Sequence, residues 1–193
     1  MVRRLAASAL ALISIATALP TAALAQELDL RSVMGFGPFY RSGPSANPIP
    51  RETVMFDGNY APGTIVISTR ERRLYLVQGD GTALRYGIGV GRDGFRWSGT
   101  HRITAKKEWP GWTPPAQMLR RRPDLPRYMA GGEDNPLGAR AMYLGSTLYR
   151  IHGSNEPETI GQAVSSGCFR MTNDDVKDLY DRVRVGTVVV VKN

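Results

Sequence analysis

The single cysteine of the chain, Cys168, lies in the run Ser165-Ser166-Gly167-Cys168. A His152-Gly153 pair lies 16 positions upstream of it, at the end of an apolar run. A lone cysteine has no partner for an intramolecular disulfide, so its thiol is buried, paired with another chain or kept reactive. Only the thiolate is a nucleophile, and it is a minor form at neutral pH, so an imidazole must remove the proton or hold it in an ion pair. We therefore predict that Cys168 is a nucleophile and His152 its base.

The residues that flank the cysteine are suited to acyl transfer. Gly167 lets the backbone turn sharply beside the sulfur, and the N–H groups of Gly167 and Cys168 are expected to face a developing oxyanion. Ser165 and Ser166 are predicted either to hydrogen-bond the substrate or the histidine, or to satisfy nearby backbone groups. The other histidine, His101, has no cysteine or glycine beside it and is expected to be a hydrogen-bonded strand residue.

Most of the chain is predicted to form strands. Short β-branched or alternating runs over residues 64–68 and 73–77 predict a hairpin, and a third run over 83–90 extends it to an antiparallel meander. Further strands are expected over residues 101–106, 141–144, 147–152 and 187–191. The valine-rich strand at the end of the chain is apolar enough to be buried on both faces.

One helix is expected, directly after the cysteine. Asn173 is its predicted N-cap, and Gly186 is predicted to end it. Val176, Leu179 and Val183 fall on one face of this helix and would bury it against the strands. The fold is therefore predicted to be mainly β, with one packed helix after the cysteine loop.

The first 62 residues are expected to lie outside the folded domain. Residues 1–25 combine two arginines, an alanine-rich apolar run and an Ala-Leu-Ala cleavage site, which is typical of a secretory signal peptide. The alternative is an uncleaved membrane anchor, which the serines, threonines and proline of this run disfavour. Residues 26–62 are rich in Gly, Pro, Ser and Asn and predict a flexible N-terminal arm, either a tether or a surface-hugging segment. The remaining residues, 63–193, are long enough for one domain with its own core.

A proline-rich segment, residues 109–138, interrupts the expected strands and carries six prolines. Long loops of this kind are often lids or binding loops. Trp109, Trp112 and Tyr128 are predicted either to line a cleft there or to seal the loop onto the core. The acidic residues of the segment are remote from any His or Cys ligand pattern, so no metal site is expected.

The formal net charge is +8, which indicates attraction to polyanions. For an exported protein these are cell-wall polymers or anionic lipid headgroups. The chain has no basic run with interleaved aromatic residues, so a nucleic-acid partner is not expected.

The chemistry-bearing residues resemble those of the YkuD-type L,D-transpeptidases, whose motif is a His-Gly pair followed by Ser-x-Gly-Cys and a basic or amide residue two positions further on. Here these positions are His152-Gly153, Ser165-Ser166-Gly167-Cys168 and Arg170, and the resemblance covers residues 63–192. It implies a YkuD-like β-sandwich or barrel. It also implies that the Gly153 carbonyl holds the imidazole tautomer, and that Arg170 holds a substrate carboxylate or pins the cysteine loop.

The resemblance further implies a cysteine-dependent acyltransferase of peptidoglycan biosynthesis that uses no cofactor. Its donor would be a tetrapeptide stem, and its acceptor an amine of another stem or of a wall-anchored protein, with consequences for wall organisation and cell shape. With water as acceptor the protein would be an L,D-carboxypeptidase. The remaining alternatives are a non-catalytic cell-wall binding module and a structural secreted β-domain. The expected location is the periplasm, in association with the cell wall.

Overall fold

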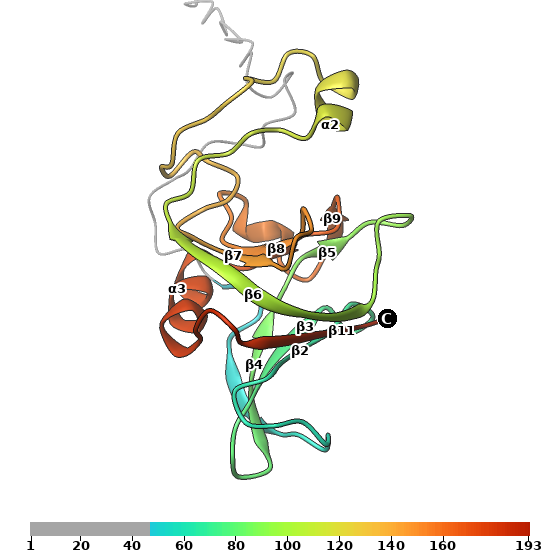
Figure 1. Cartoon of the computed structure of the whole chain (residues 1–193), viewed down its shortest axis with the longest axis vertical. Helices are drawn as coiled ribbons and strands as arrows, with labels where there is room; N and C mark the ends of the chain where they lie inside the picture. The colour runs from blue at the N-terminus through green and yellow to red at the C-terminus, as the bar shows by residue number, and fades with distance from the viewer. Residues whose placement is uncertain (1–46) are drawn as a thin grey trace, which may run out of the picture. The chain divides into compact units, whose positions relative to one another are not determined.

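The computed structural model describes residues 47–193 (Figure 1). The predicted signal peptide and residues 26–46 of the predicted arm lie outside the described residues. The strands are β1 Glu52–Met55, β2 Ile65–Ser68, β3 Arg73–Val77, β4 Thr82–Gly87, β5 Val90–Gly91, β6 Gly99–Glu108, β7 Arg140–Leu144, β8 Arg150–His152, β9 Ala163–Ser165, β10 Phe169–Arg170 and β11 Val188–Lys192. The helices are α2 Ala116–Arg121, α3 Asn173–Arg182 and a 3₁₀ turn, Pro157–Thr159.

Nine of these strands form one sheet in the order β1-β4-β3-β2-β11-β6-β7-β8-β10, and β5 pairs separately with β9. The long strand β6 joins the two halves of the sheet, because its first residues pair with β11 and its last with β7. The register shifts between Ile103 and Ala105. Such an irregularity bends a strand and increases its twist. Buried side chains of both halves consequently meet in one core, and the mainly β fold predicted from the sequence is confirmed.

The predicted meander is confirmed, since β2, β3 and β4 pair antiparallel in sequence order. Ile65, Leu74 and Tyr86 of these strands have no solvent exposure. The last strand, β11, inserts between β2 and β6. Only one of its faces meets the core: Val189 and Val191 are buried, whereas Val188 and Val190 are half-buried. The expectation that both faces are buried was therefore wrong, because the sheet is covered on one side there.

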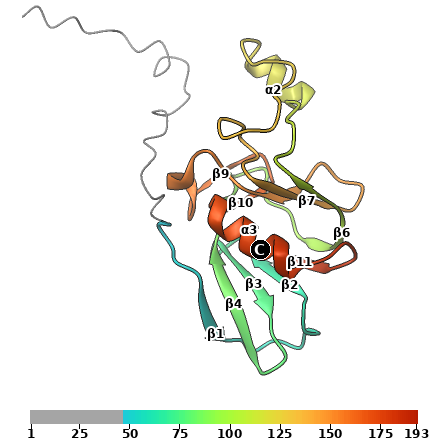
Figure 2. The ribbon, with the colours of Figure 1, turned by 90° about the vertical axis from the view of Figure 1, so that its left-hand side faces the viewer.

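Helix α3 lies between the strands of the β2–β4 meander and those around β7 and β10 (Figure 2). Val176 and Leu179 are fully buried, as the spacing predicts. The N-cap is Thr172 and not Asn173, because Thr172 has an extended backbone and its Oγ1 accepts the Asp175 N–H at 3.2 Å. Asn173 instead accepts the Ala139 N–H at 2.9 Å through its Oδ1. The helix ends at Arg182, four residues before the glycine expected to end it.

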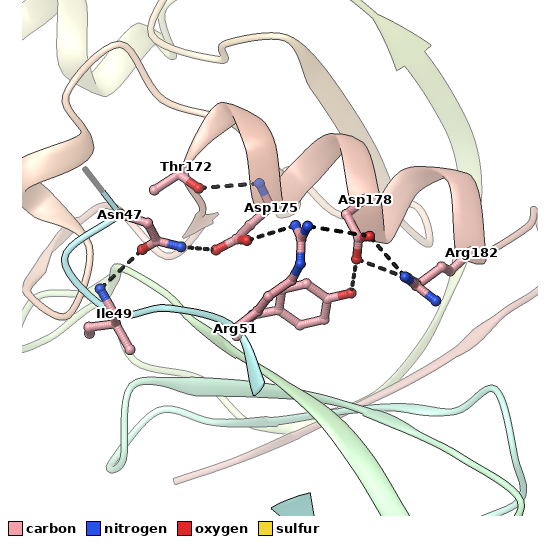
Figure 3. A network of polar contacts seen from close by, with 8 residues as sticks. Asn47, Ile49, Arg51, Thr172, Asp175, Asp178 and Arg182 are labelled. Atoms are coloured by element: carbon pink, nitrogen blue, oxygen red, sulfur yellow. Dashed lines mark hydrogen bonds and ion pairs between the residues drawn. The ribbon is translucent and has the colours of Figure 1, made fainter. Parts of the chain in front are cut away.

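Residues 47–62, which the sequence assigns to the arm, are attached to the domain in the structure. Strand β1 pairs antiparallel with β4 along the edge of the sheet. Ahead of it, Asn47 donates to Asp175 at 2.5 Å and Arg51 donates to the same carboxylate at 3.2 Å (Figure 3). Arg51 also lies 3.9 Å from Asp178, which accepts the Tyr86 hydroxyl at 2.6 Å. The folded part therefore begins before residue 63, and its first segment is held by polar contacts that a compositional pattern does not reveal.

The proline-rich segment carries a short helix, α2, which the sequence did not predict. Asn135 is buried at the end of the segment and orders it: its Nδ2 donates to the Ala130 carbonyl at 2.8 Å and its Oδ1 accepts the Leu137 N–H at 2.9 Å. Within residues 47–193, none of the helices has both the length and the apolarity that a membrane span requires.

We expect Asp175→Ala to lower the free energy of unfolding by about 2 kcal/mol, because hydrogen bonds to a charged group are each worth about 1.5–3 kcal/mol and this carboxylate accepts two from the N-terminal segment. Urea unfolding measures the change. Asp174→Ala is the matched control, since Asp174 lies in the same helical turn and is exposed. Equal stability of the two variants would show that residues 47–51 are not held by this contact.

Candidate active site

The cysteine and the histidine are brought together by two short parallel strands. Strand β10 pairs with β8 in the register Phe169 to Ile151 and Arg170 to His152. Ile151 and Phe169 are buried in the core. Because side chains alternate along a strand, His152 and Arg170 are directed to the opposite face, together with Arg150 and Cys168 two positions before them. All four residues line a cavity of about 880 Å³.

His152 is buried, and its Nδ1 lies 2.6 Å from the carbonyl oxygen of Gly153. A proton on Nδ1 donates to that carbonyl and leaves Nε2 as the basic nitrogen. Burial lowers the pKa of His152 to about 3, and the positive charges of Arg170 and Arg150 act in the same direction. The imidazole is therefore neutral at neutral pH and able to accept a proton.

Cys168 is half-buried, and its Sγ lies 3.8 Å from the Leu148 carbonyl oxygen. Burial raises the pKa of the thiol, although the positive charge of Arg150 opposes this shift. The resting pair is thus a neutral thiol and a neutral imidazole. Of the two arrangements that the sequence leaves open, the structure favours removal of the proton during attack over a preformed ion pair.

The loop before the cysteine is shaped by Gly167, which has a φ of 109°. A Cβ at this position would lie 2.5 Å from a ring carbon of Tyr149, so only glycine fits. Its carbonyl accepts the Trp97 Nε1–H at 2.8 Å, and the Trp97 ring stacks on Tyr149 with centroids 4.5 Å apart. The Trp97–Tyr149 pair therefore packs against the cysteine loop at Gly167.

The Ser165 side chain makes two hydrogen bonds to the backbone of this loop. Its hydroxyl accepts the Gly167 N–H at 3.1 Å and donates to the Cys168 carbonyl at 2.6 Å. Within residues 47–193 the Cys168 N–H has no acceptor. The predicted oxyanion role of the Gly167 N–H and the substrate contact of Ser165 do not fit this geometry, because both groups are already paired. Ser166 is half-buried and lines the cavity.

Arg170 lines the cavity but is held by an ion pair. Its Nη1 donates to Glu156 at 2.7 Å and lies 3.4 Å from the Thr159 hydroxyl, both in or beside the 3₁₀ turn. Of the two roles implied by the family resemblance, this contact matches pinning of the cysteine loop.

The proline-rich segment forms one wall of the cavity, through Trp112, residues 113–118 and Leu137. Of its three aromatic residues, Trp112 alone belongs to this wall; Tyr128 is 64% exposed. Two further lining residues, Arg121 and Arg150, were missed by the sequence reasoning. Arg150 stands two positions before the histidine, and its position in that strand was the available signal.

Comparison with known proteins gives a consistent family. Residues 62–191 match the YkuD L,D-transpeptidase catalytic domain. The probable L,D-transpeptidase YbiS of Escherichia coli K12 is 37% identical over 164 residues, which are 80% of this chain and 52% of YbiS. The chain thus spans about half the length of the curated relatives it matches.

Solved structures share the fold. The catalytic domain of the Enterococcus faecium L,D-transpeptidase superposes with a TM-score of 0.54 at 20% identity. The match covers 70% of this chain and 100% of the E. faecium domain. A Brucella melitensis structure described as a probable carnitine operon oxidoreductase is 47% identical, with a TM-score of 0.50. The match covers 82% of this chain and 98% of the Brucella chain.

The raised pKa of the thiol makes a testable prediction. The rate at which iodoacetamide labels Cys168 should rise with pH with a midpoint above about 8.5, the ordinary value of a free thiol, because less thiolate is present at any given pH. Intact mass measures the labelling. The same protein unfolded in urea is the control and should return the ordinary midpoint. A midpoint below that of the unfolded protein would show a preformed ion pair.

Proposed function

The chain belongs to the YkuD family of L,D-transpeptidases, and we propose that it is an L,D-transpeptidase with Cys168 as nucleophile and His152 as general base. The observation that carries this proposal is the parallel register of β8 and β10, which directs both side chains to one cavity. The contact from His152 Nδ1 to the Gly153 carbonyl supports it, because it leaves Nε2 available as the base.

In the first half-reaction, Cys168 Sγ attacks the carbonyl carbon of the diamino acid in a peptidoglycan tetrapeptide stem, and the thiol proton passes to His152. The Cys168 N–H, which has no acceptor within residues 47–193, supports the developing oxyanion. One such donor is worth on the order of 3 kcal/mol in other acyl-transfer enzymes. Collapse of the intermediate expels the terminal D-alanine, which takes the proton from His152, and leaves a thioester on Cys168.

In the second half-reaction an amine attacks the thioester carbonyl and loses its proton to His152. The new amide bond joins the donor stem to the acceptor, and the thiol is restored when the proton returns to sulfur. The acceptor amine belongs to a second stem or to a wall-anchored protein. Water in its place gives an L,D-carboxypeptidase, which is the alternative outcome at the same site.

A substrate in the cell wall requires an exported protein. The N-terminal residues, which have the pattern of a signal peptide, support delivery to the periplasm. The net charge, still +6 without the two arginines of residues 1–25, supports association with anionic wall polymers. A wall-binding module without catalysis would retain the basic charge but would have no use for the thiol and imidazole in one cavity.

We expect Cys168→Ala to abolish thioester formation and turnover while leaving folding intact, because Cys168 is half-buried at the cavity and carries no core contact of its own. Cys168→Ser should be nearly inactive, since a hydroxyl has a far higher pKa than a thiol. The mature protein is incubated with purified tetrapeptide muropeptides, and dimers, trimmed tripeptides and acyl-enzyme are measured by mass. Cross-linking by purified Cys168→Ala would contradict the proposal.

A further inference from the structure

The charged side chains that line the cavity are all basic. They are Arg121 from α2, Arg150 from β8 and Arg170 from β10, and the lining contains no Asp or Glu. A cavity with this charge attracts an anionic ligand. The partners of the three arginines differ, and this difference identifies the one that is ready to bind it.

Arg121 is exposed, and Arg170 already has a carboxylate partner in Glu156. Arg150 has neither an ion pair nor a hydrogen-bond acceptor for its guanidinium within residues 47–193, and its Nε is buried without a partner. The guanidinium lies over the ring of Tyr143, 5.3 Å from the centroid. A partly buried, unpaired guanidinium is unfavourable, and a ligand anion would relieve this cost.

The position of Arg150 relative to the nucleophile is fixed by the strand register. In the parallel pair, Ile151 is opposite Phe169; Arg150 precedes Ile151 in β8, and Cys168 directly precedes β10, so the two residues lie side by side just before this pair. Adjacent strands are about 4.8 Å apart. In agreement with this proximity, the positive charge of Arg150 lowers the pKa of the Cys168 thiol and opposes the effect of burial. A ligand carboxylate on Arg150 would therefore lie within one residue of the carbonyl that Cys168 attacks.

We propose that Arg150 binds the terminal carboxylate of the donor peptide, which belongs to the D-amino acid that is expelled. This assignment rests on the proposed function. In a tetrapeptide donor that carboxylate is on the residue directly after the scissile amide. One residue spans at most about 3.3–3.6 Å, so in a pentapeptide the carboxylate would lie beyond this guanidinium by about that length. The fork of a guanidinium matches a carboxylate with two parallel hydrogen bonds.

The test combines a change in the enzyme with a change in the substrate, alone and together. Wild-type protein and Arg150→Gln are compared on tetrapeptide donors that end in a carboxylate or in a carboxamide, with release of the terminal residue measured as kcat/KM. Amidation of the donor should lower kcat/KM of the wild type about 100-fold, which is within the range found when one partner of a buried charged pair is truncated. In Arg150→Gln, kcat/KM on the carboxylate donor should be lower by a similar factor. Amidation of the donor should not lower it further. Arg150→Lys should recover part of the preference.

Lys107→Gln is the matched control. Its ammonium faces the same Tyr143 ring at 5.8 Å, but Lys107 is exposed and does not line the cavity. This variant removes the same charge and should keep the full wild-type preference for the carboxylate donor.

Three outcomes would overturn the assignment. A wild type that converts both donors equally well disproves it without any variant, even if Arg150→Gln fails to fold. An Arg150→Gln protein that is slowed equally on both donors shows that the arginine acts on the thiol and not on the substrate. A wild type that converts neither donor disproves the proposed function, and the assignment falls with it.

Discussion

The parallel pairing of β8 and β10 is the constraint on which the site depends. Only two residue pairs are in register, yet they decide which side chains face the cavity. A slip of one residue would send Cys168 into the core and Phe169 into the cavity, because side chains alternate with a period of two. Ile151 and Phe169, both almost fully buried, prevent this slip. The hydrophobic core thus fixes the position of Cys168 relative to His152.

Close backbone packing around the first turn of α3 keeps this pair of strands in place. The Met171 N–H donates to the His152 carbonyl at 2.8 Å, which extends the contact between the two strands toward the helix. Asn173 then reaches back to the residues after the histidine: a Cβ at Gly138 or Gly153 would lie 2.3 Å from its Oδ1. Glycine follows the histidine because the helix start, the end of the proline-rich segment and the His-Gly turn share one small space.

The features that the sequence predicted are those encoded locally. Alternation predicted the meander, helical spacing predicted the buried face of α3, and the cysteine with its preceding glycine predicted the loop. The features that were missed depend on partners distant in sequence. Strand β1 forms only as an edge partner of β4, and the pairing of Arg170 with Glu156 follows from how the 3₁₀ turn packs. Likewise the bonds of the Ser165 hydroxyl exist only once the loop has closed.

The arginines of the cavity have opposite effects on the two halves of the catalytic pair. Their positive charge favours the thiolate of Cys168, but it disfavours the protonated form of His152 that the proposed proton transfer would produce. Burial is the largest cause of both pKa shifts and keeps both groups neutral in the resting site. An anionic donor bound at Arg150 would neutralise part of this charge and so raise the basicity of the imidazole. On this argument a bound donor carboxylate raises the pKa of His152, so that proton transfer is coupled to substrate binding.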